Sequence, residues 1–134
     1  MLDDSYGKLI GPVYSLAALA TLWDCSEQEA ARRAERLSML ALQVGDRKLY
    51  PSFQLDGAEP REDVLEAAFL LSLAGEHETA ALWLVTACCG DRLGRTHLQL
   101  LDLGERRQVV AEAAETASRW ADERELTRQK GEQE

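Results

Sequence analysis

The side chains in this sequence that could perform catalysis or bind a metal are two histidines and three cysteines. Neither His77 nor His97 has a partner at a spacing that indicates a catalytic triad, so we predict that the chain is not an enzyme. Zinc sites need spaced pairs such as Cys-x₂-Cys, whereas Cys88 and Cys89 are adjacent and Cys25 stands apart. We therefore expect no metal and no cofactor, and we interpret Cys88 and Cys89 as small buried apolar residues.

Length and charge limit the classes of protein to which the chain can belong. Its 134 residues suit one domain or two very small ones, and 46% hydrophobic and 29% charged residues are ordinary for a globular protein. The net charge of −9 argues against extended binding to nucleic acid or to anionic membranes, but it allows a local basic patch. The odd number of cysteines indicates a reducing compartment. No signal peptide or membrane-spanning run is recognisable, so we predict a cytoplasmic protein that does not bind membranes.

Two short helices joined by a tight turn are predicted near the N-terminus. Apolar residues recur at i, i+3, i+4 and i+7 over residues 16–23, which indicates one amphipathic helix. Ser26 and Glu29 have the spacing of a capping box and begin a second helix that ends near Leu37. Asp24 lies at the turn, where its side chain tolerates unusual backbone conformations. This is the helix-turn-helix pattern.

A β-hairpin is predicted directly after these helices. Apolar residues alternate over residues 40–44, Gly45 and Asp46 form a two-residue turn signal, and residues 47–50 form the return strand. A hairpin in this position is the wing of a winged helix-turn-helix. Residues 1–14 are expected to be irregular.

The second half of the sequence is predicted to be helical, with the boundary at residues 56–60. We expect a mainly α protein, with a helix-turn-helix and a small β-hairpin in residues 1–57 and a helical bundle in residues 58–134. The expected helices cover residues 61–74, 78–86, 96–103 and 105–128.

Small residues and capping residues mark where these helices begin and end. Thr96 is a suitable N-cap for the short third helix, Gly104 suits the left-handed position after it, and Gly75 takes the same position after the first. On the last helix, an apolar stripe runs to Trp120 while Glu112 falls on the polar side. Trp120 either packs on its own domain or anchors a partner, because tryptophan is enriched at interface hot spots.

Basic side chains are concentrated on the second helix and the hairpin. Such a set is typical of phosphate contacts to DNA, although carboxylates at Glu27 and Glu29 would repel phosphates. The alternative is a solvated helix face in which arginines pair with nearby carboxylates. The residues that would contact DNA are Gln28, Arg32, Arg33, Arg36, Arg47 and Lys48.

Two blocks of sequence resemble a known family. Residues 44–56, which contain Tyr-Pro-Ser-Phe-Gln, resemble the junction after the helix-turn-helix in bacterial antitoxins with an MbcA/ParS/Xre toxin-binding domain. Residues 83–104 begin with Trp-Leu and end with Leu-Gly-Arg-Thr-His-Leu-Gln-Leu-Leu-Asp-Leu-Gly, and they resemble the signature of that domain. His97 stands where the family usually has proline. The resemblance covers roughly residues 15–120.

The resemblance implies an antitoxin. Such proteins bind RES-domain toxins, which consume NAD⁺, and they cover the active-site cleft of the toxin; many also repress their own operon. We therefore expect a cognate toxin and operator DNA as partners, in a homo-oligomer or a toxin–antitoxin hetero-oligomer. The alternative is a winged helix-turn-helix transcription regulator whose C-terminal half dimerises. The expected toxin contacts are Arg95, His97, Gln99, Leu101 and Trp120.

Overall fold

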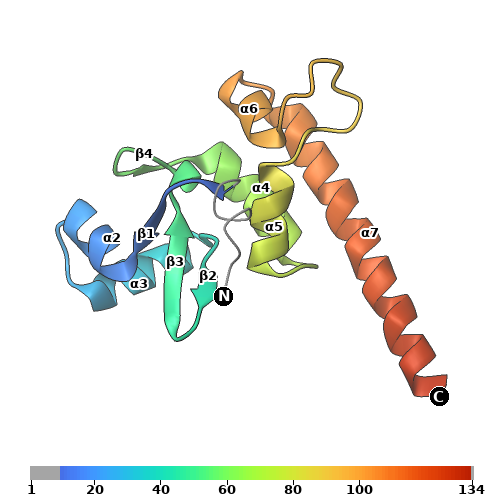
Figure 1. The fold of residues 1–134 in the computed structure, drawn as a ribbon, viewed down its shortest axis with the longest axis horizontal. Helices are drawn as coiled ribbons and strands as arrows, with labels where there is room; N and C mark the ends of the chain where they lie inside the picture. Colours follow the sequence, from blue (N-terminus) through green and yellow to red (C-terminus); the bar gives the residue numbers. More distant parts are fainter. Residues whose placement is uncertain (1–9, 134) are drawn as a thin grey trace.

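A computed structural model describes residues 10–133 and contains helices around a small antiparallel sheet (Figure 1). The fold is mainly helical, as predicted. Its helices are α2 (Leu16–Leu22), α3 (Glu27–Arg36), α4 (Glu62–Ser72), α5 (His77–Leu84), α6 (His97–Asp102) and α7 (Arg106–Gln133), with a 3₁₀ turn η1 (Ser52–Gln54). Its strands are β1 (Val13–Ser15), β2 (Leu42–Val44), β3 (Arg47–Pro51), β4 (Leu55–Asp56) and β5 (Glu59–Pro60).

The first two helices begin where the sequence predicts, and the turn between them lies where it is expected. The Ser15 hydroxyl accepts from the N–H of Ala18 at the start of α2, and the Ser26 hydroxyl accepts from the N–H of Glu29 at the start of α3. Asp24 has a φ of 52° in the turn between them. Aspartate is one of the few side chains that adopts this left-handed conformation at a modest free-energy cost. The expected turn at Asp24 is therefore confirmed.

The sheet contains the predicted hairpin and one additional strand. β2 pairs with β3 in antiparallel register, with Val44 opposite Arg47 across the turn. The other edge of β3 pairs with β1, which places Tyr14 opposite Tyr50. The expectation that residues 1–14 are irregular is wrong for Val13 and Tyr14, because β3 offers them a partner that is distant in sequence; residues 1–9 lie outside the described residues.

The Gln54 side chain connects the end of η1 to the segment before β2 through hydrogen bonds. Its side chain is fully buried. The side-chain Oε1 accepts from the backbone N–H of Leu40, and Nε2 donates to the carbonyls of Leu40 at 3.1 Å and Pro51 at 3.2 Å. The buried amide therefore gives hydrogen-bond partners to the backbone groups of Leu40 and Pro51. This is the structural role of Gln54 within the Tyr-Pro-Ser-Phe-Gln segment.

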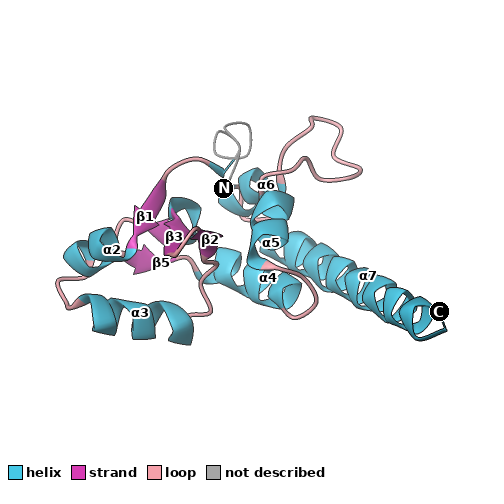
Figure 2. Ribbon diagram, turned by 60° about the horizontal axis from the view of Figure 1, so that its bottom comes forward, coloured by secondary structure: helices cyan, strands magenta, loops and turns pink. Residues whose placement is uncertain are grey.

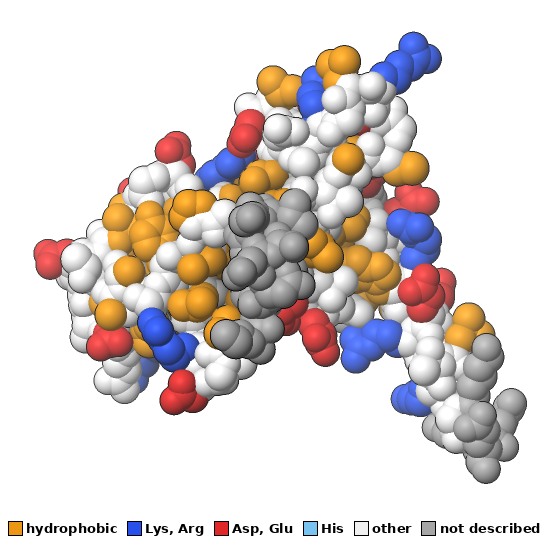
Figure 3. Space-filling model, in the orientation of Figure 1, with side chains coloured by type: hydrophobic (Ala, Val, Ile, Leu, Met, Phe, Trp, Pro, Cys, Tyr) orange, Lys and Arg blue, Asp and Glu red, His pale blue; other side chains and the backbone are white. Residues whose placement is uncertain are grey.

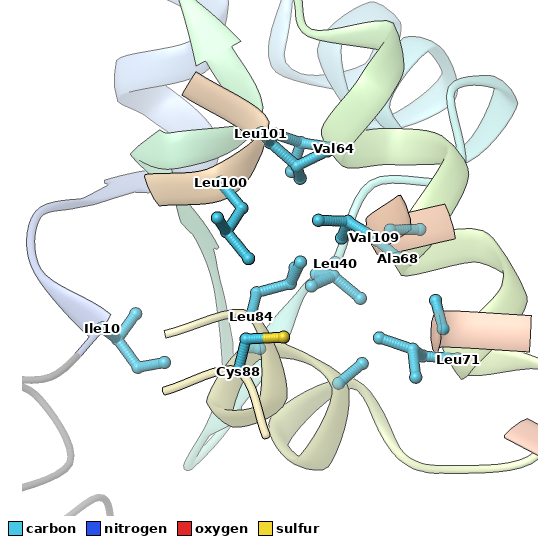
Figure 4. Packing of buried hydrophobic residues seen from close by; sticks show 14 of the residues in the cluster. Ile10, Leu40, Val64, Ala68, Leu71, Leu84, Cys88, Leu100, Leu101 and Val109 are labelled. Carbon is cyan, nitrogen blue, oxygen red and sulfur yellow. The ribbon is translucent and has the colours of Figure 1, made fainter. Parts of the chain in front are cut away.

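The C-terminal helices contribute most of the larger buried cluster (Figure 4). Within it, α7 packs along α4. Leu71 and Leu84 are completely buried there, and Cys88 lies beside Leu84. Gly75 is not in the left-handed conformation that the sequence suggested. A Cβ at Gly75 would instead lie 2.8 Å from Cε3 of Trp120. This glycine therefore makes room for a tryptophan.

The two halves of the chain share buried residues. Leu40 and Leu42 come from the first half but belong to the larger cluster. Leu65 of α4 belongs to the smaller cluster, with Leu19 and Tyr50. Figure 2 shows the sheet between α2 and α3 on one side and α4 and α5 on the other. The sheet thus lies between the two groups of helices.

Candidate functional site

The segment before α6 is a short hairpin-like loop held by its own polar groups. Ala87 forms an antiparallel bridge with Thr96. Asp91 accepts from the backbone N–H of Arg95 and from its guanidinium, with a shortest Oδ1–Nη2 distance of 2.8 Å. These hydrogen bonds lower the pKa of the Asp91 carboxyl. Thr96 then caps α6, and Gln99 completes a capping box with it, so the predicted start of this helix is confirmed.

The predicted toxin contacts occupy two kinds of position. Arg95 and Gln99 face solvent, and the Arg95 side chain is 37% exposed beside Asp91. His97 and Leu101 are only 5% and 3% exposed. Their placement on an exposed contact surface is therefore incorrect for this structure, because the buried face of α6 packs against α4 and α7. Trp120 is half-buried against Gly75, so part of its ring remains accessible.

Two exposed leucines flank α6 and were not among the predicted contacts. Leu93 lies in the loop and is 77% exposed, and Leu103 follows α6 and is 60% exposed. Both belong to the segment that resembles the antitoxin signature. The sequence therefore indicated that this segment matters, but it did not indicate that these two side chains are exposed. We call Leu93, Arg95, Gln99 and Leu103 the α6 surface. Exposed apolar side chains beside hydrogen-bonding groups are typical of a protein-binding surface.

The predicted DNA contacts lie on α3 and at the hairpin. Gln28, Arg32 and Arg36 are exposed and spaced by four residues, so they form one row on α3 that points away from buried Ala30 and Ala34. Arg47 and Lys48 are exposed on β3. Arg33 differs from the others because its guanidinium lies 4.4 Å from the centre of the Trp23 ring. This cation–π contact gives Arg33 a role in packing.

A groove of about 890 Å³ separates α3 from the hairpin and the end of α4. Its walls include Glu27 and Glu35 of α3, Arg47 and Lys48 of β3, and the exposed ring of Phe69. The groove is thus lined by acidic side chains of α3, by basic side chains of the hairpin and by apolar residues such as Met39 and Tyr50. On the face shown in Figure 3, charged side chains of both signs line the far part of α7.

A cluster that was not predicted from the sequence joins Cys88, His97 and Glu112. The Cys88 thiol donates to Oε2 of Glu112 at 2.9 Å, and the same oxygen lies 3.5 Å from Nε2 of His97. The imidazole stacks on Trp83 with ring centres 3.5 Å apart. Burial, followed by the hydrogen bond to Glu112, raises the pKa of Cys88 to about 12.

This cluster corrects two expectations about individual side chains. Cys88 is buried as expected, but Cys89 is exposed. Glu112 does not lie on a fully solvated face of α7, because its carboxylate turns towards Cys88 and His97. The contacts of Glu112 could not be predicted from sequence spacing, because Cys88 and His97 belong to the loop and to α6, well before Glu112 in the sequence.

Within residues 10–133, none of the helices combines the length and the apolar composition that crossing a bilayer requires. Comparisons of the chain with protein-family models, with curated proteins and with solved structures gave no match.

Proposed function

We propose that this chain is an antitoxin that binds a RES-type, NAD⁺-consuming toxin through the α6 surface and covers its active site. The observation that supports this proposal best is that local hydrogen bonds and a helix cap hold the segment that carries the α6 surface. The capping box at Thr96 and the Asp91–Arg95 pair fix the backbone on which exposed Leu93 and Leu103 are carried. A preorganised surface loses less conformational entropy when it binds a partner.

The charge of the chain and the resemblance of residues 83–104 to the toxin-binding signature also support this proposal. A net charge of −9 complements a cleft that binds the anionic phosphates of NAD⁺. In this proposal the buried His97 and Leu101 position α6, whereas the exposed side chains contact the toxin. Trp120 and the first turns of α7 extend the contact.

The proposal predicts that a RES-domain toxin is encoded by the neighbouring gene, that the chain restores growth to bacteria that express this toxin, and that the two proteins co-purify. Replacing Leu103 by glutamate places a charge in the contact, so we expect the affinity to fall at least about tenfold. Leu73→Glu is the matched control, because Leu73 is similarly exposed but lies just after α4, away from α6. Failure of the wild-type chain to restore growth and to co-purify would overturn the proposal.

DNA binding is the second function that a specific observation favours. The element order β1, α2, α3, β2, β3 is the order that a winged helix-turn-helix requires, and the exposed row on α3 would face the major groove. Gln28 and Arg32 would contact bases, and Arg36, Arg47 and Lys48 would contact phosphates. This function is compatible with toxin binding, because the α6 surface belongs to the other half of the chain.

A gel shift on the DNA upstream of the gene tests this second function. We expect Arg32→Glu combined with Arg36→Glu to lower the affinity at least about tenfold and to reduce the slope of log affinity against log salt by about two. Arg107→Glu combined with Arg119→Glu changes the net charge equally on α7 and serves as the control. An equal loss of DNA affinity in the two double variants would mean that the α3 arginines act only through the net charge, and it would contradict a DNA contact at α3.

A further inference from the structure

Cys88, His97 and Glu112 bring three metal-ligand atoms together from three separate elements. One ligand atom from each residue, a sulfur, a ring nitrogen and a carboxylate oxygen, lies within 4.8 Å of the other two. A tetrahedral zinc site needs neighbouring ligand atoms about 3.3–3.6 Å apart, given bonds of about 2.0–2.3 Å. The N–O separation of 3.5 Å falls in this range, whereas the S–O separation of 2.9 Å is that of the thiol hydrogen bond and would lengthen when a metal replaces the proton. Small side-chain movements would therefore complete the geometry.

The hydrogen bonds of His97 leave the correct nitrogen available for a metal. Nδ1 lies 2.8 Å from the carbonyl oxygen of Trp83, and a carbonyl oxygen only accepts, so Nδ1 carries a proton. In the neutral ring, Nε2 then directs its lone pair at the carboxylate oxygen of Glu112. Two acceptors that face each other need a proton or a cation between them. An N–H donated to a backbone carbonyl is also the usual way in which a metal-binding imidazole is oriented.

We propose that Cys88, His97 and Glu112 form a binding site for a single zinc-class divalent cation, with the fourth position open to solvent. A thiolate, an imidazole and a carboxylate form a donor set that suits Zn²⁺ better than Mg²⁺ or Ca²⁺. The Glu112 side chain is 32% exposed, which gives the ion a route of entry. On binding, the Cys88 thiol releases its proton to solvent and a sulfur–metal bond forms. Metal binding at this site does not require that the chain is an antitoxin.

A metal ion bound at this site would cross-link three segments of the chain. Cys88 belongs to the loop after α5, His97 is the first residue of α6, and Glu112 belongs to the early part of α7. The stack of His97 on Trp83 and the buried position of Cys88 hold two of the ligands in place without a metal. The cation would therefore add stability to an arrangement that already exists.

Titration of the metal-free full chain with Co²⁺ tests the site directly, because Co²⁺ occupies zinc sites and absorbs visible light. We expect one Co²⁺ per chain, with the visible bands of a tetrahedral ion and a thiolate-to-cobalt band in the near ultraviolet. Zn²⁺ should displace the Co²⁺, whereas Mg²⁺ should not. The absence of any Co²⁺-dependent absorption in the wild-type chain would overturn the proposal.

Two variants test Cys88 and Glu112 as ligands, and a third is the control. Cys88→Ser should remove the thiolate-to-cobalt band, whereas Cys89→Ser, the adjacent exposed cysteine, should keep it. Glu112→Gln changes a partly exposed side chain and keeps its size, so the fold should persist while the Co²⁺ affinity falls at least about tenfold. Zn²⁺ should raise the melting temperature of the wild-type chain more than that of Glu112→Gln. A band that survives Cys88→Ser, or equal Co²⁺ affinity in Glu112→Gln, would contradict the assignment.

Discussion

Replacing Gln54 by alanine is expected to lower the free energy of unfolding by about 3–5 kcal/mol. The change removes the side-chain hydrogen bonds to the Leu40 N–H, the Leu40 carbonyl and the Pro51 carbonyl at a fully buried position. Each polar group left without a partner costs about 1–3 kcal/mol, and the space vacated by the side chain adds to the loss. Urea denaturation followed by circular dichroism measures the difference.

Two further variants separate the hydrogen bonds of Gln54 from its volume. Gln54→Glu keeps the size but replaces the Nε2 donor by an acceptor, so it should destabilise the chain at least as much as alanine does. Gln43→Ala is the control, because Gln43 is exposed and its side-chain amide donates to the carbonyl of Gly45, two residues away. We expect the control to change stability by less than about 0.5 kcal/mol. A loss below about 1 kcal/mol for Gln54→Ala would contradict the role given to the buried amide.

Replacing Gly75 by alanine is expected to destabilise the chain by about 1–3 kcal/mol through the packing of α7. The new Cβ would lie 2.8 Å and 2.9 Å from two atoms of the Trp120 ring, which is rigid and half-buried. The backbone of Gly75 does not require glycine, because its φ is outside the left-handed region. The expected loss of stability therefore arises from the clash between the new Cβ and the Trp120 ring, and not from backbone strain. Thermal denaturation measures it.

A double-mutant cycle isolates this contact. In a Trp120→Ala background, Gly75→Ala should cost less than about 0.5 kcal/mol, because the ring that it would meet is gone. Gly131→Ala is the matched control on α7, where an added Cβ meets nothing within 4 Å. It should not lower stability, since alanine favours helices over glycine. Additive effects of Gly75→Ala and Trp120→Ala would contradict the proposed contact.

Local signals in the sequence predicted most of the helices correctly. Ser26 and Thr96 cap helices where their types and spacing indicated, and Asp24 turns the chain with a positive φ. The interaction that determines each of these features lies within a few residues of it. β1 could not be predicted in this way. Its three residues pair with β3, and only the folded chain brings the two strands together.

The candidate sites were less predictable because burial depends on packing between elements. His97 lies in the family-like signature, yet its ring is covered by Trp83 and its neighbours rather than presented to a partner. The helical period placed Glu112 on the polar side of its helix, but α6 and the preceding loop cover one edge of that side. A three-element cluster has no sequence spacing that predicts it, unlike Cys-x₂-Cys. The row Gln28, Arg32 and Arg36 was predictable because it repeats within one helix.

The antitoxin proposal predicts that a RES-domain toxin is encoded by the neighbouring gene. Its most direct test measures NAD⁺ consumption by that purified toxin while increasing amounts of the chain are added. The proposal predicts that consumption falls in proportion to the added chain and stops at a fixed molar ratio. The Leu103→Glu variant should require a higher concentration, whereas Leu73→Glu should behave like the wild type. Undiminished NAD⁺ consumption in the presence of excess folded wild-type chain would contradict the proposal.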